Sequence, residues 1–157
     1  MQVLIAYYSR TGNTAAMAEL VAEGVEEVSG VEPLVKKVEE VTLQDLLAAE
    51  GIILGSPTYY GAAARQIKKL IDRSNKHHGK LEGKVGGAFT SAMNVGGGNE
   101  TALLNMLCML LVHGLIIPGF SKGDHYGPVA LEAPDERAAE NCRRLGQRVA
   151  ELVRKLA

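Results

Sequence analysis

The residues with the clearest chemical potential follow the first apolar stretch of the chain. Val3 to Tyr8 is an apolar run expected to form a strand, and the segment Ser9 to Thr14, SRTGNT, comes directly after it. Within that segment Gly12 can adopt the positive φ that a tight turn requires. A helix is expected to begin near Asn13, so backbone N–H groups and the positive end of a helix dipole would converge on one spot. The segment therefore predicts an anion site.

The composition of this turn narrows the kind of anion. It contains no lysine, and the chain has neither the GxxxxGK[ST] nor the GxGxxG spacing here. A terminal phosphomonoester fits such a turn better than a pyrophosphate or a triphosphate. The alternative is an ordinary strand-to-helix turn with one capping residue. The concentration of donors favours the phosphate site, whose candidate residues are Ser9, Arg10, Thr11, Gly12, Asn13 and Thr14.

Two further loops stand out because each also follows a predicted strand. Ser56 to Gly61, SPTYYG, comes after the apolar run Gly51 to Gly55, and Ser91 to Gly98 follows a strand expected over Val85 to Ser91. In an open parallel sheet the carboxyl ends of the strands meet at one crevice, where ligands bind. The two adjacent tyrosines of the first loop would offer an aromatic face there; the alternative is that they are surface aromatics.

The order of elements predicts one α/β domain over residues 1–157. Strand and helix patterns alternate five times, which is typical of a parallel sheet with helices on both faces. Pro33 places its strand at an edge of the sheet. The expected strands are Val3–Tyr8, Val31–Val38, Gly51–Gly55, Val85–Ser91 and Leu115–Phe120. The expected helices run from Asn13 to Gly30, from Thr42 to Ala49 with a capping box, from after Gly61 through Ile71, from Glu100 to His113, and from Pro134 onward.

Two of these helices carry the cysteines, and both thiols are expected to be buried. Cys108 lies in a helix that is apolar nearly all round. Cys142 lies on the apolar stripe of the last helix, which is expected to bury Ala138, Cys142, Leu145, Val149, Leu152 and Leu156. Two isolated cysteines exclude a disulfide framework and a metal or iron–sulfur cluster, and they fit a reducing, cytoplasmic location. His77 and His78 lack partners at ligand spacing, so no metal site is expected.

The overall charge and hydropathy exclude several partners. With 17 basic and 18 acidic side chains, the net charge of −1 favours neither nucleic acid nor an anionic membrane. The longest apolar stretch, Met106 to Phe120, is too short to span a bilayer and is interrupted by His113, Gly114 and Pro118. No charged region precedes the first apolar run, so no signal peptide is expected.

Five motifs give the chain a resemblance that covers nearly its whole length. They are YYSRTGNT at 7–14, GSPTYYG at 55–61, TSAMNVGGGNET at 90–101, LLVHG at 110–114 and HYG at 125–127. With these motifs the chain resembles the flavodoxin-like superfamily, and within it the FMN-dependent NAD(P)H:quinone oxidoreductases related to the tryptophan-repressor-binding protein. The resemblance implies a three-layer sandwich with a five-stranded parallel sheet in the order 2-1-3-4-5. It also implies a homodimer or homotetramer.

The resemblance implies a role for each loop. Ser9 to Thr14 would hold the phosphate of FMN. One side of the isoalloxazine ring would be lined by Pro57, Thr58, Tyr59, Tyr60 and Gly61, and the other edge by Ser91, Ala92, Met93, Asn94, Val95 and Gly96. His113 matches a histidine at the flavin site and is the candidate catalytic residue. The alternative for His113 is a core histidine that caps the C-terminus of its own helix.

The implied activity is two-electron transfer from NAD(P)H to a quinone. The alternative is a flavodoxin-type carrier that passes single electrons between protein partners. Carriers of that kind are usually strongly acidic so that they can dock on basic partners, and the balanced charge of this chain therefore favours the enzyme. One departure from the family is the absence of tryptophan, with Lys76, His77 and His78 in the region where a tryptophan often flanks the substrate pocket.

Overall fold

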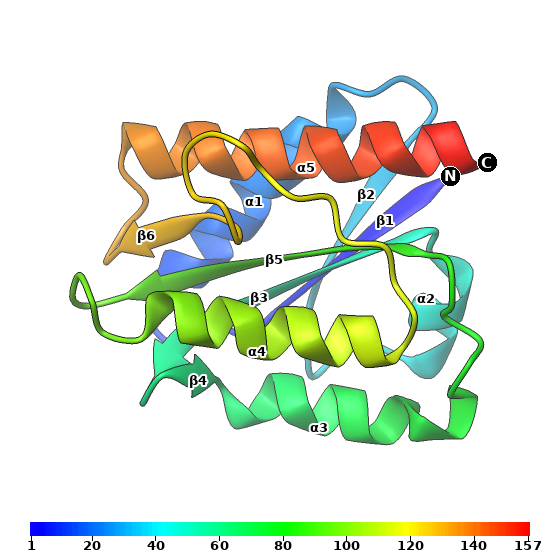
Figure 1. The fold of residues 1–157 in the computed structure, drawn as a ribbon, viewed down its shortest axis with the longest axis horizontal. Coiled ribbons are helices and arrows are strands. Elements are labelled where there is room, and N and C mark those ends of the chain that lie inside the picture. The colour runs from blue at the N-terminus through cyan, green and yellow to red at the C-terminus, as the bar shows by residue number, and fades with distance from the viewer.

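The computed structural model describes all 157 residues as a three-layer α/β sandwich (Figure 1). Its sheet has the strand order β2-β1-β3-β5-β6, and these five strands are parallel. A two-residue strand, β4, pairs antiparallel with the end of β3. When β4 is left out and the five parallel strands are numbered along the chain, their order in the sheet is 2-1-3-4-5, as predicted. The strands are β1 (Gln2–Tyr7), β2 (Glu32–Lys37), β3 (Gly51–Tyr59), β4 (Ala62–Ala63), β5 (Val85–Ala92) and β6 (Val129–Leu131).

Helices cover both faces of the sheet. α1 (Asn13–Glu26) and α5 (Glu136–Leu156) pack on one face; α2 (Leu43–Ala48), α3 (Arg65–Ser74) and α4 (Asn99–Val112) lie on the other, and a 3-10 turn, η1 (Asn75–His77), follows α3 (Figure 1). The alternation of side chains along β1 explains both layers. Val3 and Ile5 belong to the apolar core under α1 and α5, whereas Leu4 and Ala6 belong to the core on the opposite face. None of the helices is long and apolar enough to cross a membrane.

The helices α1 and α5 touch through their backbones. A Cβ atom added to Gly24 of α1 would lie 1.9 Å from the carbonyl oxygen of Arg143, and one added to Gly146 of α5 would lie 2.0 Å from the carbonyl oxygen of Val21. Each helix thus places a glycine against a carbonyl group of the other. Only a residue without a side chain allows this separation.

The capping box predicted for α2 is present. The Thr42 hydroxyl accepts a hydrogen bond from the Asp45 N–H at 3.1 Å, and the Asp45 carboxylate accepts one from the Thr42 N–H at 2.7 Å. The same carboxylate forms an ion pair with Lys36 at 2.9 Å. The ion pair joins the start of α2 to the edge strand β2.

The prediction of a fifth strand over Leu115–Phe120 is wrong. In that segment Ile116 forms only an isolated bridge to Val85. The strand beside the end of β5 is β6, which lies in the segment 121–133 that was expected to be a loop. Pro118 cannot donate a backbone hydrogen bond to a ladder, so the chain leaves the sheet there and returns only for three residues.

The prediction that α4 is buried all round is also wrong. Leu111 is 54% exposed and Val112 is 74% exposed, and Cys108, expected to be buried, is exposed as well. The helix contacts the core with one stripe that includes Leu103 and Met106, and its opposite stripe faces away from the sheet. Cys142 is buried as predicted.

The last helix differs from its prediction at both ends. It begins at Glu136 rather than Pro134, because the Asp135 carboxylate caps it by accepting a hydrogen bond from the Ala138 N–H at 2.7 Å. Leu156, expected to be buried, is exposed in the final turn. The two chain termini lie beside each other, at the edge of the sheet where the strands begin (Figure 1).

Candidate functional site

The three predicted loops meet in a cleft at the carboxyl edge of the sheet. Its volume is about 320 Å³. Every residue that lines it was predicted from the sequence except Glu132. The lining residues are Arg10, Thr11, Asn13, Thr14, Pro57, Thr58, Tyr59, Ser91, Ala92, Met93 and Glu132.

The turn before α1 leaves hydrogen-bond donors free at the cleft. Gly12 precedes the helix with φ 99° and donates its N–H to the Ser9 hydroxyl at 3.1 Å. The first three helical N–H groups, those of Asn13, Thr14 and Ala15, donate to no protein atom. The first turn of α1 also contains no acidic residue. Free N–H groups at a helix N-terminus are the arrangement that binds a phosphate.

Hydrogen bonds from threonine and serine hydroxyls connect the ends of the strands near the cleft. The hydroxyls of Thr14 and Ser91 are 2.8 Å apart and buried, which links the start of α1 to the end of β5. The Thr90 hydroxyl donates to the carbonyl of Ser56 at 2.7 Å and lies 2.8 Å from the hydroxyl of Thr58. Because Thr90 has only one hydroxyl proton, Thr58 donates in that second bond. Two sets of hydrogen bonds therefore hold three side chains that line the cleft, those of Thr14, Thr58 and Ser91.

The loop after β3 is a tight hairpin. Thr58 pairs with Ala63 and Tyr59 with Ala62, leaving a two-residue turn of Tyr60 (φ 49°) and Gly61 (φ 76°). Positive φ at both positions defines a type I′ turn, which is unusual for tyrosine. The turn projects the Tyr60 side chain fully into solvent, while Tyr59 is partly covered and lines the cleft.

The glycine-rich loop from Ser91 to Gly98 packs against this hairpin. A Cβ atom on Gly98 would lie 2.6 Å from the Cα of Gly61, so the two loops touch through their backbones. Within the second loop, the Asn94 carbonyl accepts a hydrogen bond from the Asn99 side chain at 3.2 Å. Several predicted residues belong to these loops without lining the cleft, namely Ser9, Gly12, Tyr60, Gly61, Asn94, Val95 and Gly96.

The structure does not bring His113 to the cleft within one chain. His113 follows α4 as its C-cap, at the end of the helix opposite to the one beside the glycine-rich loop. Its ring is buried, with Nε2 2.8 Å from the Ser74 hydroxyl, and its centroid is 5.8 Å from that of His78. This position agrees with the alternative interpretation of His113 as a core residue that caps its own helix.

The burial of His113 predicts an acid-sensitive contribution to stability. Burial, and then repulsion by the charge of His78, lower the pKa of His113 below its ordinary value of 6.5. In the unfolded chain this histidine binds a proton at higher pH, so the free energy of unfolding should fall as the pH drops below 6.5. Urea unfolding at pH 7.5 and 5.5 should show a smaller loss for His113→Gln than for the unmodified protein. Equal losses would contradict this contribution.

Glu132 is the cleft residue that sequence reasoning missed. It follows β6 with φ 58°, and its N–H donates to the Ala92 carbonyl at 2.8 Å. Tyr60 and Glu132 are the two non-glycine residues of the chain with positive φ. Strained backbone of this kind persists where surrounding structure holds it, often at ligand sites. A three-residue strand leaves no sequence pattern from which the position of Glu132 could be found.

Comparisons with known proteins agree with the fold and the cleft. Residues 1–126 match the family model described as NADPH-dependent FMN reductase. A flavodoxin of Aquifex aeolicus is 42% identical over 160 residues, covering 97% of this chain and 86% of the relative. An NAD(P)H dehydrogenase (quinone) of Archaeoglobus fulgidus is 34% identical, covering 99% and 98%. The crystal structure of a flavodoxin, WrbA-like protein from Agrobacterium tumefaciens superposes with a TM-score of 0.83 at 30% identity, covering 99% of both chains.

The fold and its strand-end cleft define the chain as a flavodoxin-like protein. Since the family model spans most of its length, the chain belongs to the NADPH-dependent FMN reductase family of oxidoreductases. The predicted family is thereby confirmed, together with FMN as the cofactor and a nicotinamide nucleotide as the electron donor. The free N–H groups in the first turn of α1 fit the phosphate of FMN, which is the part of the cofactor that a helix N-terminus can bind.

Proposed function

We propose that this protein transfers two electrons from NAD(P)H to a quinone, with FMN held in the cleft formed by the three strand-end loops. The observation that carries the proposal is the set of free N–H groups at Asn13, Thr14 and Ala15 beside the aromatic and hydroxyl side chains of the cleft. The quinone dehydrogenase relative in Archaeoglobus fulgidus, matched over nearly the whole of both chains, supports the choice of acceptor.

Each wall of the cleft has a task in this reaction. The free N–H groups in the first turn of α1 bind the phosphate, and Arg10 adds a positive charge at the same end. Tyr59 and Met93 supply an aromatic and an apolar side chain to the lining of the cleft, against which a flat ring can pack. When bound, FMN supplies the ability to accept a hydride and return two electrons. The fixed Thr58 and Thr90 hydroxyls hold the cleft in shape during this exchange.

The second candidate function is a single-electron carrier. It is favoured by the flavodoxins of Aquifex aeolicus and Clostridium saccharobutylicum, which are 42% and 37% identical to the chain. A carrier of that class usually presents a strongly acidic surface to its partners. The balanced charge of this chain, −1 in total, supports the enzyme instead.

Anaerobic mixing tests the proposed function directly. FMN-loaded protein should lose its visible flavin absorbance rapidly with NADPH or NADH, and the colour should return when benzoquinone is added. In steady state, one quinone should be reduced for each nicotinamide nucleotide oxidised. If neither nucleotide bleaches the flavin, although a chemical reductant does, the protein is a carrier and the proposed reaction is wrong.

We also propose that the protein works as a homodimer or homotetramer in the cytoplasm. The exposed stripe of α4, formed by Leu104, Cys108, Leu111 and Val112, supports an assembly of identical chains because it is apolar and unpartnered. The free thiol within the stripe fits a reducing compartment.

A charge placed on this stripe should separate the subunits. Leu111→Glu should lower the molar mass measured by light scattering to that of one chain, because a carboxylate would be buried without a partner. Leu156→Glu is a matched control, since Leu111 and Leu156 are both 54% exposed and Leu156 lies at the end of α5. An unchanged mass for Leu111→Glu would exclude α4 as the interface.

A further inference from the structure

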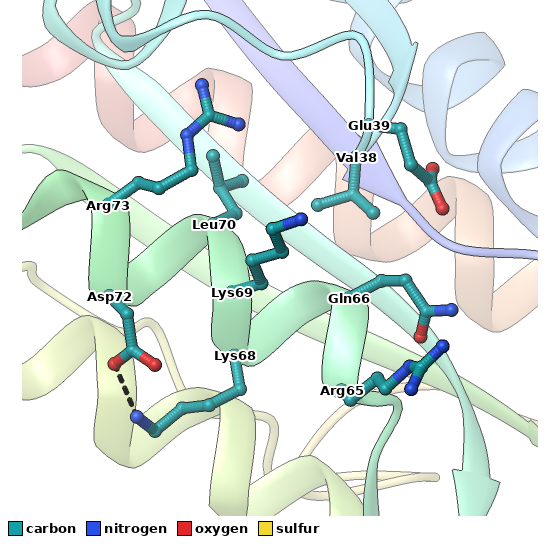
Figure 2. Close-up of a pocket in the computed structure, with 9 residues that line it drawn as sticks. All are labelled: Val38, Glu39, Arg65, Gln66, Lys68, Lys69, Leu70, Asp72 and Arg73. Carbon is teal, nitrogen blue, oxygen red and sulfur yellow. Dashed lines mark hydrogen bonds and ion pairs between the residues drawn. The ribbon is translucent and has the colours of Figure 1, made fainter.

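A surface cavity of about 770 Å³ lies beside α3, apart from the FMN cleft (Figure 2). Four cations of α3 line it, and we consider three of them as one row: Arg65, Lys69 and Arg73. They are spaced four residues apart, so they follow one face of the helix at intervals of about 6 Å. The facing wall is formed by Val38 and Glu39, which follow β2.

None of these three cations has an acidic partner within the chain. The ion pair seen in Figure 2 joins Lys68 to Asp72, which leaves Arg65, Lys69 and Arg73 unpaired. Like charges four residues apart on a helix repel each other and destabilise it. The row therefore costs α3 some stability. A bound anion would offset this cost.

The cationic groove begins next to the FMN cleft. Arg65 is the first residue of α3 and follows directly after the hairpin that carries Tyr59. The N–H of Ala64, one residue earlier, donates to the Ser56 hydroxyl at 2.8 Å, which fixes the start of the helix to β3. A ligand longer than the cleft could therefore reach from Tyr59 along the row of cations.

We propose that this groove binds the 2′-phosphate and pyrophosphate of NADPH, and that it selects NADPH over NADH. The inference rests on the proposed function, because it takes the nucleotide to be the electron donor. The forked guanidinium groups of Arg65 and Arg73 match phosphate oxygens, and Lys69 between them adds a point charge. Glu39 on the opposite wall can accept hydrogen bonds from ribose hydroxyls or an adenine amino group. NADH lacks the 2′-phosphate, so it would gain less from the three cations.

The binding test uses a fragment that cannot react. Calorimetric titration of the FMN-loaded protein with 2′,5′-ADP should show binding at least tenfold tighter than with 5′-AMP. The double substitution Lys69→Gln with Arg73→Gln should remove this difference. Lys76→Gln is the matched control, because Lys76 is an exposed cation in η1 that does not line the groove; it should leave the difference intact. No preference for 2′,5′-ADP, or an equal loss in the Lys76→Gln control, would overturn the assignment.

Steady-state kinetics test the nucleotide-binding groove independently of the proposed quinone reductase activity. In the double variant the KM for NADPH should rise at least tenfold, while the KM for NADH and the kcat with either nucleotide change little. Persistent NADPH oxidation with an unchanged KM would overturn the groove and leave the quinone reductase intact. If no form of the protein oxidised NADPH or NADH, the proposed reductase activity would be wrong. If selective binding of 2′,5′-ADP were nevertheless lost only in the double variant, the assignment of the groove would still be supported.

Discussion

Replacing Gly12 with valine should weaken FMN binding by about tenfold or more. Gly12 has φ 99°, and an added Cβ atom would meet nothing within 4 Å. The added Cβ atom therefore meets no other part of the fold, and the main effect of the substitution comes from the backbone. A β-branched residue held at such a dihedral costs of order 1–3 kcal/mol, so the turn would relax to another conformation when it can. The N–H groups of Asn13 and Thr14 would then no longer point together at the phosphate.

A second glycine supplies the control for this experiment. Gly79 has φ 83°, and a Cβ atom there would also meet nothing within 4 Å, but Gly79 lies in the loop between α3 and β5. Gly79→Val should lower stability by a similar amount and leave the dissociation constant of FMN unchanged. Fluorescence titration of apoprotein with FMN measures both variants. If Gly12→Val bound FMN as tightly as Gly79→Val, the turn before α1 would not be the phosphate site.

Replacing Gly146 with alanine should destabilise the fold by about 3 kcal/mol. In an open helical position this substitution would stabilise α5 by about 1 kcal/mol, because alanine is the better helix former. Here the new methyl group would lie 2.0 Å from the carbonyl oxygen of Val21, so α1 and α5 must move apart along their whole contact. At about 2–4 °C for each kcal/mol, the melting temperature should fall by roughly 6–12 °C.

A neighbouring position tests whether the effect comes from the helix contact. Gln147→Ala changes the same helix at a half-buried residue and should shift the melting temperature by no more than a few degrees. Thermal unfolding followed by circular dichroism compares the two variants. A Gly146→Ala protein that melts at or above the unmodified one would show that α1 and α5 can separate without cost.

The features that the sequence predicted well are those set by neighbouring residues. The turn before α1 depends on Gly12 and on the start of the helix that follows, and the capping box depends on Thr42 and Asp45. Both are complete within a few consecutive residues. The convergence of three loops followed from one general property of parallel sheets, so the cleft was predicted without any knowledge of its side-chain contacts.

The features that escaped prediction depend on contacts between distant segments. β6 is a strand because Val129 to Leu131 pair with the end of β5, and the three residues have no periodicity of their own. The sequence of α4 is apolar nearly all round, so the sequence did not indicate which stripe of the helix packs on the sheet and which is exposed. The sequence showed that His113 has a chemically active side chain, but not where that side chain lies. Because α4 runs away from the cleft, His113 at its C-terminus lies far from the cleft and contacts Ser74 instead.

The position of the chain ends has a consequence for protein engineering. Both termini emerge where the strands begin, and the cofactor cleft lies where they end (Figure 1). A second domain fused to either terminus would lie at the end of the molecule opposite the cofactor cleft, so it would leave the cleft accessible to small molecules. The proximity of the ends also permits a circular permutant in which a short linker joins Ala157 to Met1 and the chain is opened at the exposed Gly79 loop.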